Sequence, residues 1–202
     1  MTTPNSEVPV VLEAGGSRVE IRPALGGRLT SLRLAGREWL AATDGADGAA
    51  GLDDCFPTVE ACELDVPGLG RVALPADGEL RGQSAATERA AASAGAAAAV
   101  TRWAGVQLGY ALTRTLTVQA DGAVRADYVL EARADAPLPF LWAARAALPL
   151  PPDTRLDLPV AARVRVWDAD GVALGARGAE HRWPVLRVGD RATTPFGPRE
   201  VD

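Results

Sequence analysis

Apolar and polar residues alternate along most of the chain, and glycine-rich turn signals separate the alternating segments. Residues 18–22 alternate directly after Gly15-Gly16, and residues 30–34 do so before Gly36. Successive side chains of a β-strand point to opposite faces, so a period of two is typical of a strand with one buried face. The pattern therefore predicts half-buried strands in these segments.

The segment 110–133 predicts a β-hairpin. Its first half alternates leucine and valine with threonine, and its second half alternates apolar with charged residues. Asp121-Gly122 lies between the halves and favours a two-residue turn. Residues 163–167 predict a further strand, and Asp170-Gly171 predicts the turn that follows it.

Residues 87–100 fit two interpretations. They are rich in alanine, which has the highest helix propensity, but Gly95 interrupts them and strand-type residues follow. Because propensity is a weak predictor among strands, we favour two strands that turn at Gly95 over a helix. Together the patterns predict an all-β fold, a large antiparallel β-sandwich, in one domain that spans residues 1–202.

The composition is that of a globular protein and argues against several functions. Hydrophobic residues make up 48% and charged residues 23% of the chain, and the net charge is −5. An acidic chain without a basic stripe does not favour nucleic-acid binding, and no apolar run has the length of a membrane helix. Residues 1–6 have neither basic residues nor an apolar run, so we expect no signal peptide and a cytoplasmic protein.

The inventory of reactive side chains is small. All 21 basic residues are arginine, which excludes a Schiff-base lysine and a P-loop. The spacing of Cys55 and Cys62 is not that of a zinc knuckle, and the single histidine, His181, cannot complete a Cys/His site. We expect two buried free thiols, a surface or capping role for His181, no metal and no cofactor.

Six short segments stand out in order along the chain: residues 26–32 (GGRLTSL), 36–40 (GREWL), 54–58 (DCFPT), 75–82 (PADGELRG), 139–145 (PFLWAAR) and 154–159 (TRLDLP). Taken in this order, they resemble segments of the aldose 1-epimerase (galactose mutarotase-like) family. Each string is weak alone, but their shared order argues against chance. The resemblance implies a large sandwich of the galactose mutarotase-like type and a small-molecule carbohydrate as ligand.

The same resemblance implies chemistry that opens and recloses a sugar ring with a base and an acid on opposite sides of one bond. The family has a histidine acid where this chain has Arg145, and a second histidine where it has Asp77. Arginine, with a pKa above about 12, has no proton to give at neutral pH. The family's base is a glutamate near the C-terminus. The chain ends at Asp202, before that region, so we expect it to lack this glutamate and the last strands, unless it is a truncated piece.

Three functions remain open at this point. The first is carbohydrate binding without efficient epimerase activity. The second is an active epimerase on an acidic sugar, in which Asp77 and Glu79 transfer protons and Arg145 holds a phosphate or carboxylate. The third is an interaction protein whose open sheet edge is covered by a partner or in a homodimer. The candidate functional residues are Arg145 and Asp77 for catalysis and Glu79, Arg81, Trp142 and Asp54 for ligand binding.

Three of these candidates also have a purely structural interpretation. Arg145 fits a strand residue that pairs with a nearby carboxylate. Asp77, directly before Gly78, is a typical turn former. Trp142 fits a core position, as tryptophans on alternating strands often do.

Overall fold

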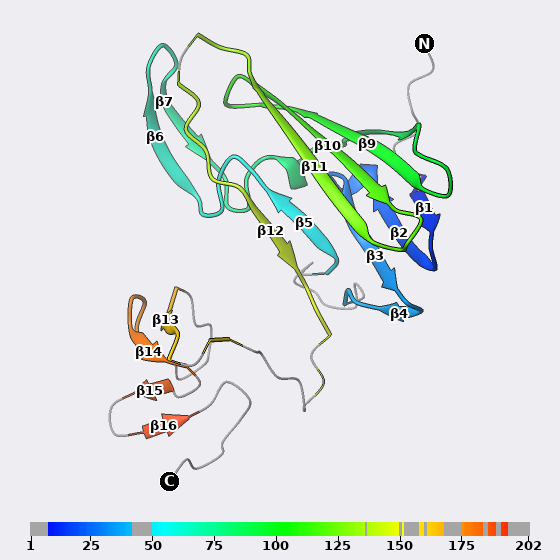
Figure 1. The fold of residues 1–202 in the computed structure, drawn as a ribbon. Coiled ribbons are helices and arrows are strands. Elements are labelled where there is room, and N and C mark those ends of the chain that lie inside the picture. Colours follow the sequence, from blue (N-terminus) through cyan, green and yellow to red (C-terminus); the bar gives the residue numbers. More distant parts are fainter. Residues whose placement is uncertain are drawn as a thin grey trace. The chain divides into compact units, whose positions relative to one another are not determined.

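The computed structural model describes residues 8–41, 50–135, 137–149, 151, 158–159, 161–167, 175–183, 186–188 and 191–193. The chain divides into two compact units, residues 1–149 and 150–202, which we describe separately. Nearly all regular elements are strands (Figure 1). The helical segments of the described chain are two short 3-10 turns, neither of which is long and apolar enough to cross a membrane: η1 (Pro23–Leu25) and η2 (Leu80–Gly82).

The larger sheet of the first unit has six strands, and all of its pairings are antiparallel. They are β1 (Val10–Ala14), β2 (Ser17–Arg22), β3 (Arg28–Leu34), β4 (Arg37–Glu38), β5 (Leu52–Cys55) and β12 (Ala143–Ala146). The order is β1-β2-β3-β5-β12, and β4 pairs with β3. The strand predicted over residues 18–22 is confirmed as β2, in which buried and half-buried residues alternate.

The second sheet of this unit has four antiparallel strands in the order β11-β10-β9-β8. They are β8 (Ala86–Ala90), β9 (Ala97–Ala104), β10 (Tyr110–Val118) and β11 (Val124–Ala132). The alanine-rich segment forms the β8–β9 hairpin, so the two-strand interpretation is confirmed. Gly95 lies between these strands with a φ of +76°, and Ala99 is fully buried in the core. Packing of small side chains between the sheets thus outweighs their helix propensity.

The hairpin predicted over residues 110–133 is confirmed as β10 and β11. Its turn is one residue longer than predicted. Gln119 donates its backbone N–H to the carbonyl of Ala123, and Gly122 donates to the carbonyl of Gln119. The loop therefore contains Ala120, Asp121 and Gly122, with Gly122 at a φ of +86°, rather than two residues.

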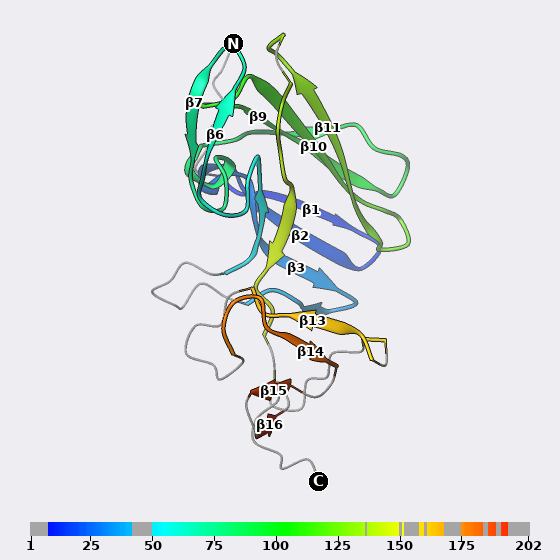
Figure 2. The same cartoon turned by 90° about the vertical axis from the view of Figure 1, so that its left-hand side faces the viewer.

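The two sheets of the first unit lie against each other (Figure 2), and residues of both form a hydrophobic core. One cluster joins Val19 and Ile21 of β2 to Leu116 and Val118 of β10. A second cluster contains Phe56 together with residues of the β6–β7 hairpin. This hairpin is formed by β6 (Cys62–Val66) and β7 (Gly70–Leu74), and Val66, Val72 and Leu74 belong to the cluster. The arrangement is the predicted antiparallel sandwich.

The second unit contains two small antiparallel hairpins. They are formed by β13 (Arg163–Arg165) with β14 (Glu180–Arg182), and by β15 (Leu186–Val188) with β16 (Arg191–Thr193). The strand predicted at residues 163–167 is observed in part, as β13, which ends at Arg165. The turn predicted at Asp170-Gly171 and the resemblance at residues 154–157 lie outside the described residues. The single domain expected over residues 1–202 stays a prediction.

His181 does not lie at the surface as predicted. It is the middle residue of β14 and pairs in register with Val164 of β13. Its exposed fraction is 6%. On a three-residue strand the middle side chain points away from its two neighbours, and here it points inward. Of the surface or capping role predicted for His181, the surface alternative is therefore wrong, and the capping alternative stays a prediction.

Candidate functional site

Three consecutive residues of β5 point alternately to the two sides of the six-stranded sheet. Asp54 points inward, where it meets Arg114 of β10, whereas Asp53 points to the opposite side, where it meets Arg28. We call this opposite side the outer face; on β2 it carries the half-buried polar residues that alternate with the buried core residues. Because β12 pairs with β5 so that Arg145 lies opposite Asp53, Arg145 also belongs to the outer face.

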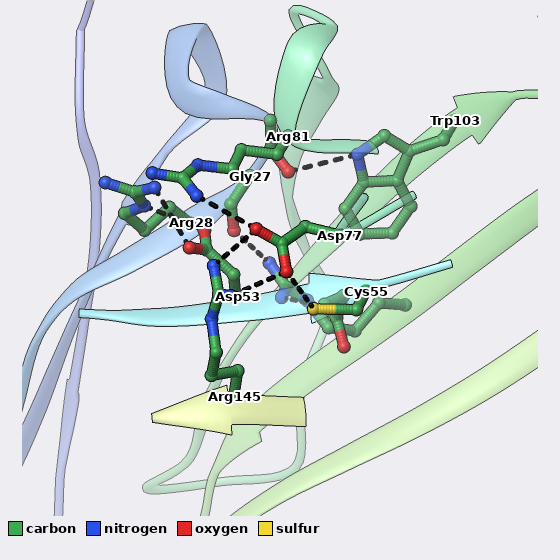
Figure 3. Close-up of polar contacts among 11 residues, drawn as sticks. Gly27, Arg28, Asp53, Cys55, Asp77, Arg81, Trp103 and Arg145 are labelled. Carbon is green, nitrogen blue, oxygen red and sulfur yellow. Dashed lines mark hydrogen bonds and ion pairs between the residues drawn. The ribbon is translucent and has the colours of Figure 1, made fainter. Parts of the chain in front are cut away.

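Arg145 and Asp77 form a bidentate ion pair on the outer face (Figure 3). The Nη1–Oδ1 distance is 2.5 Å and the Nη2–Oδ2 distance is 2.8 Å. Arg81 of η2 also donates to Asp77, with an Nη1–Oδ2 distance of 3.2 Å. The Arg145 side chain is 46% exposed and that of Asp77 is 22% exposed. The two residues at the positions that the resemblance assigns to the family's histidines therefore lie side by side in space and form an ion pair with each other.

The loop that carries Asp77 is held in place by its backbone. Asp77 has a φ of +63° and Gly78 a φ of +73°, a left-handed turn that aspartate tolerates and glycine favours. Asp77 donates its N–H to the carbonyl of Val59, and Glu79 donates to that of Phe56. A Cβ atom on Gly78 would lie 2.2 Å from the Phe56 carbonyl oxygen, so only glycine allows this close approach.

Arg28 and Asp53 form a second bidentate pair beside the first. Their contacts are 2.7 Å and 2.9 Å, and both side chains are less than 10% exposed. We define the outer cluster as Arg28, Asp53, Asp77, Arg81 and Arg145. It contains three guanidinium groups and two carboxylates, all of them drawn in Figure 3.

Cys55 is buried next to the outer cluster, with its Sγ 3.9 Å from Oδ1 of Asp77. Burial raises the pKa of the Cys55 thiol; the charge of Arg145 acts in the opposite direction without reversing the shift. A thiol with a raised pKa is a poor nucleophile. Both cysteines are free, as expected, but Cys62 is only half-buried.

Arg145 keeps its proton in this environment. Partial burial by itself would lower the pKa of Arg145, but the hydrogen bonds and the charge of Asp77 outweigh it and raise this pKa above its ordinary value. Arg145 therefore acts as a fixed positive charge and hydrogen-bond donor. Within the described part of the chain, no group of three or more His, Cys, Asp or Glu residues is placed to hold a metal ion.

Asp54 belongs to a separate, buried network on the inner side of the sheet. Its side chain is 1% exposed and accepts hydrogen bonds from Arg114 at 2.6 Å, from the Tyr128 hydroxyl at 2.8 Å and from the Trp142 indole at 3.2 Å. Burial, followed by the charge of Asp54, raises the pKa of Tyr128. Arg114 also donates to the carbonyl of Gly27 at 2.6 Å. This network joins the two sheets of the sandwich.

Glu79 forms a third, independent arrangement. Its carboxylate accepts hydrogen bonds from the backbone amides of Val106 and Gln107, at 3.0 Å and 2.7 Å, and from the hydroxyl of Tyr110 at 3.0 Å. Burial and the charge of Glu79 raise the pKa of Tyr110. Among the described residues, Glu79 and Asp77 have no hydrogen-bond partner in common, so the two carboxylates do not meet at one group.

The predicted site residues thus fall into three groups. Asp77, Arg81 and Arg145 lie together on the outer face, Asp54 and Trp142 lie together on the inner side, and Glu79 supports the 106–107 loop. Arg28 and Asp53 were not among the predicted residues. Arg28 lies within the family-like segment 26–32, and Asp53 directly precedes the family-like segment 54–58. The alternation of side chains along these two segments was the sequence signal that could have identified both residues.

The second unit has a pocket of its own, of about 500 Å³. The lining residues are Arg163, Val164, Arg165, Trp167 and Glu180. Glu180 pairs with both arginines, and these hydrogen bonds lower the pKa of Glu180 to about 2. None of the predicted site residues lines this pocket.

The chain is similar in fold to a protein from Escherichia coli K12 whose crystal structure is named "Putative aldose 1-epimerase". The TM-score is 0.62 and the sequence identity 13%, over 91% of this chain and 63% of the other, so the chain spans less than two thirds of that protein's length. No protein-family model matches the chain, and no curated protein matches it in sequence. At this identity the likeness shows the fold: the chain has the β-sandwich of an aldose 1-epimerase-like protein.

Proposed function

We propose that this protein binds a carbohydrate on the outer face of its six-stranded sheet and does not catalyse efficient epimerisation. The observation that carries the proposal is the bidentate pair of Arg145 and Asp77. It stands at the two positions where the resemblance implies catalytic and sugar-binding histidines. The fold likeness to an aldose 1-epimerase-like protein supports the carbohydrate as ligand class.

The pair is unsuited to proton transfer. An acid–base catalyst needs a group that gains and loses a proton near the working pH. Arg145 does not do so, because Asp77 raises its pKa above an already high value. Both oxygens of Asp77 are acceptors for guanidinium groups, from Arg145 and from Arg81.

The same groups are suited to binding. Sugar hydroxyls are recognised by fixed donors and acceptors on a preformed surface, and the ion pairs hold both kinds in place here. Arg145 lies on a strand and Asp77 on a loop fixed by backbone hydrogen bonds, so neither needs much ordering when a ligand arrives. Trp142 belongs to the inner network and is not required for this interaction.

Two measurements test the proposal. A panel of monosaccharides should raise the melting temperature of the protein, and polarimetry should show anomer interconversion at the rate of buffer alone. The Arg145→Gln variant should reduce the thermal shift. Arg125→Gln is the matched control, because Arg125 forms a similar exposed pair with Asp127 on the other sheet. Interconversion that is clearly faster than buffer and is lost in Arg145→Gln would overturn the proposal.

A second candidate function is association through an open sheet edge. Among the described strands, β11 pairs only with β10, and β12 pairs only with β5. Large apolar side chains at Phe140, Leu141 and Trp142 are 46% to 64% exposed directly before β12. Open edges invite pairing with another chain, and a second copy of this chain is the simplest occupant. Light scattering after size-exclusion chromatography should then report a dimer; a monomer at high concentration would argue against this function.

A further inference from the structure

The edge strand β11 has few of the features that protect sheet edges from pairing. Among the described strands it pairs only with β10, in a continuous register over nine residues (Figure 2). Natural proteins protect such edges with short strands, prolines, bulges or charged side chains. β11 is long, contains no proline and has no bulge against β10, so its charged side chains decide which strand can pair with it.

The other edges of the two described sheets are less suited to a new partner. β1 and β8 end the sheets on one side, and there Arg89 of β8 donates to the carbonyl oxygen of Val11 in β1. This contact occupies a backbone acceptor of β1. On the other side, β12 has only four residues. β11 therefore offers the longest edge to another strand.

The hydrogen bonds of β11 show which of its backbone groups point outward. In an antiparallel pair, alternate residues direct both N–H and C=O toward the neighbouring strand. Arg133 donates its N–H to Gly109, and Gln119 donates to Ala123, so the odd-numbered residues of β11 face β10. The even-numbered residues of β11 therefore direct their N–H and C=O groups to the open side.

The side chains of β11 form two different surfaces. Even-numbered residues face the interior, where Tyr128 and Leu130 pack against the core. Odd-numbered residues face solvent, and the side chains of Arg125 and Glu131 are 65% and 64% exposed. These opposite charges lie on either side of Tyr128, at equal distances along the strand. A strand with this arrangement is complementary in charge to an antiparallel copy of itself.

We propose that β11 pairs with β11 of a second copy of this chain, antiparallel and centred on Tyr128. This inference rests on the second candidate function, association through an open edge, and names the strand and its register. All nine residues of each strand are then paired. Arg125 of each copy lies opposite Glu131 of the other, and opposite charges at facing positions stabilise a sheet.

Other registers of the same two strands are less favourable. A centre at residue 127 places Asp127 opposite its own copy, and a centre at residue 129 places Asp127 opposite Glu131. Like charges at facing positions destabilise a sheet. A shift of the centre by two residues avoids these contacts but pairs only five residues of each strand. Charge and overlap thus select the same register.

The proposed pairing ends at two copies. Both copies use the same strand, so the contact is isologous and leaves β11 of neither copy open. One pair of edge strands buries less area than a standard interface, so we expect a weak dimer, with a dissociation constant on the order of 100 µM. Unfolding measured at about 1 µM therefore reports the single chain.

Sedimentation equilibrium of the full chain between about 1 µM and 1 mM tests the pairing. The apparent mass should rise from 21.0 kDa toward that of two chains. Arg125→Glu and Glu131→Arg each place like charges opposite each other at both ends of the paired strands. Each variant alone should weaken the dimer about 10- to 30-fold.

An equal mixture of Arg125→Glu and Glu131→Arg restores opposite charges at both ends and should associate as tightly as the unmodified protein. Misfolded variants could not produce this recovery. Arg71→Glu is the matched control, because Arg71 forms a similarly exposed pair with Glu63 on the β6–β7 hairpin. It should leave the dimer unchanged.

The outcomes separate this inference from the second candidate function. A dimer that both charge reversals leave intact would overturn the β11 register and keep association through another edge. Masses that grow beyond two copies would overturn the isologous pairing. A single chain at every concentration would overturn both the inference and the second candidate function, and would leave carbohydrate binding untouched.

Discussion

Arg145 and Asp77 are 68 positions apart in the sequence, yet each nitrogen at the end of the Arg145 guanidinium donates to a different oxygen of Asp77. The pair joins an edge strand of the six-stranded sheet to a loop that precedes the four-stranded sheet. It therefore fixes the relative position of the two segments that supply the exposed half of the outer cluster.

A double-mutant cycle should measure the strength of this pair. Asp77→Asn keeps the size and Arg145→Gln keeps a polar side chain without the charge, and asparagine tolerates the positive φ of position 77. We expect a coupling energy of about 1 kcal/mol, at the upper end for partly exposed pairs because the geometry is bidentate. Urea unfolding of the four proteins gives this value, and the exposed Arg125–Asp127 pair should give less. Strictly additive effects at positions 77 and 145 would contradict it.

Gly78→Ala should strongly destabilise the protein. The substitution combines an unfavourable φ with a Cβ atom 2.2 Å from the Phe56 carbonyl oxygen, so the loop must move. We expect a loss of about 3 to 5 kcal/mol in the free energy of unfolding.

Gly36→Ala is the matched control for this substitution. Gly36 has a φ of +78°, and a Cβ atom there would contact nothing within 4 Å. It should cost only about 1 to 2 kcal/mol, the strain of the backbone alone. Equal losses for the two variants in urea unfolding would show that the close approach at Gly78 is unimportant.

The buried ion pair of Asp54 and Arg114 should respond differently to single and double substitution. Asp54→Asn leaves the enclosed Arg114 charge without its partner, and we expect a loss of about 3 to 5 kcal/mol. The double variant Asp54→Leu/Arg114→Met removes both charges and should recover part of this loss. Tyr128→Phe removes one hydrogen bond and should cost about 1 kcal/mol. Failure of the double variant to exceed Asp54→Asn in stability would contradict this account.

Acidic pH should lower the free energy of unfolding, in part because Glu38 becomes protonated. Burial alone would raise the pKa of Glu38, but hydrogen bonds from the Ser31 hydroxyl and from three backbone amides outweigh it and lower this pKa below its ordinary 4.5. A lowered pKa in the folded state stabilises the protein above about pH 4.5, and this contribution is lost as the pH falls through the folded value.

Glu38→Gln should therefore lower the free energy of unfolding at pH 7 by about 1 to 2 kcal/mol and flatten its decline below pH 5. Urea midpoints measured between pH 3 and pH 7 check both effects. Glu131→Gln, at an exposed position of β11, is the control and should follow the unmodified protein. A parallel decline in Glu38→Gln and the unmodified protein would contradict the assignment.

The strands could be predicted from the sequence because a period of two is local information. Residues 18–22 and 110–133 needed no knowledge of distant segments. The extra residue in the 120–122 loop was missed because Asp121-Gly122 fits both a two-residue and a three-residue turn.

The arrangement of the site could be predicted only in part. The resemblance identified positions 77 and 145, but their contact depends on the pairing of β12 with β5, which no local pattern reveals. Asp77 and Glu79 have the same parity and would share a face on a strand. The positive φ values at Asp77 and Gly78 break that geometry and turn Glu79 toward Tyr110 instead.

Consecutive residues of the short strand β5 have opposite roles: Asp54 joins the two sheets, while Asp53 and Cys55 contact the residues of the outer cluster. A register shift of this strand by one residue would move each side chain to the opposite face of the sheet and would break both sets of contacts. Mutations on β5 that stabilise the interior should also alter the affinity for the carbohydrate that we propose as ligand of the outer face. In an engineered or evolving lineage of this protein, thermal tolerance and ligand preference should therefore change together rather than independently.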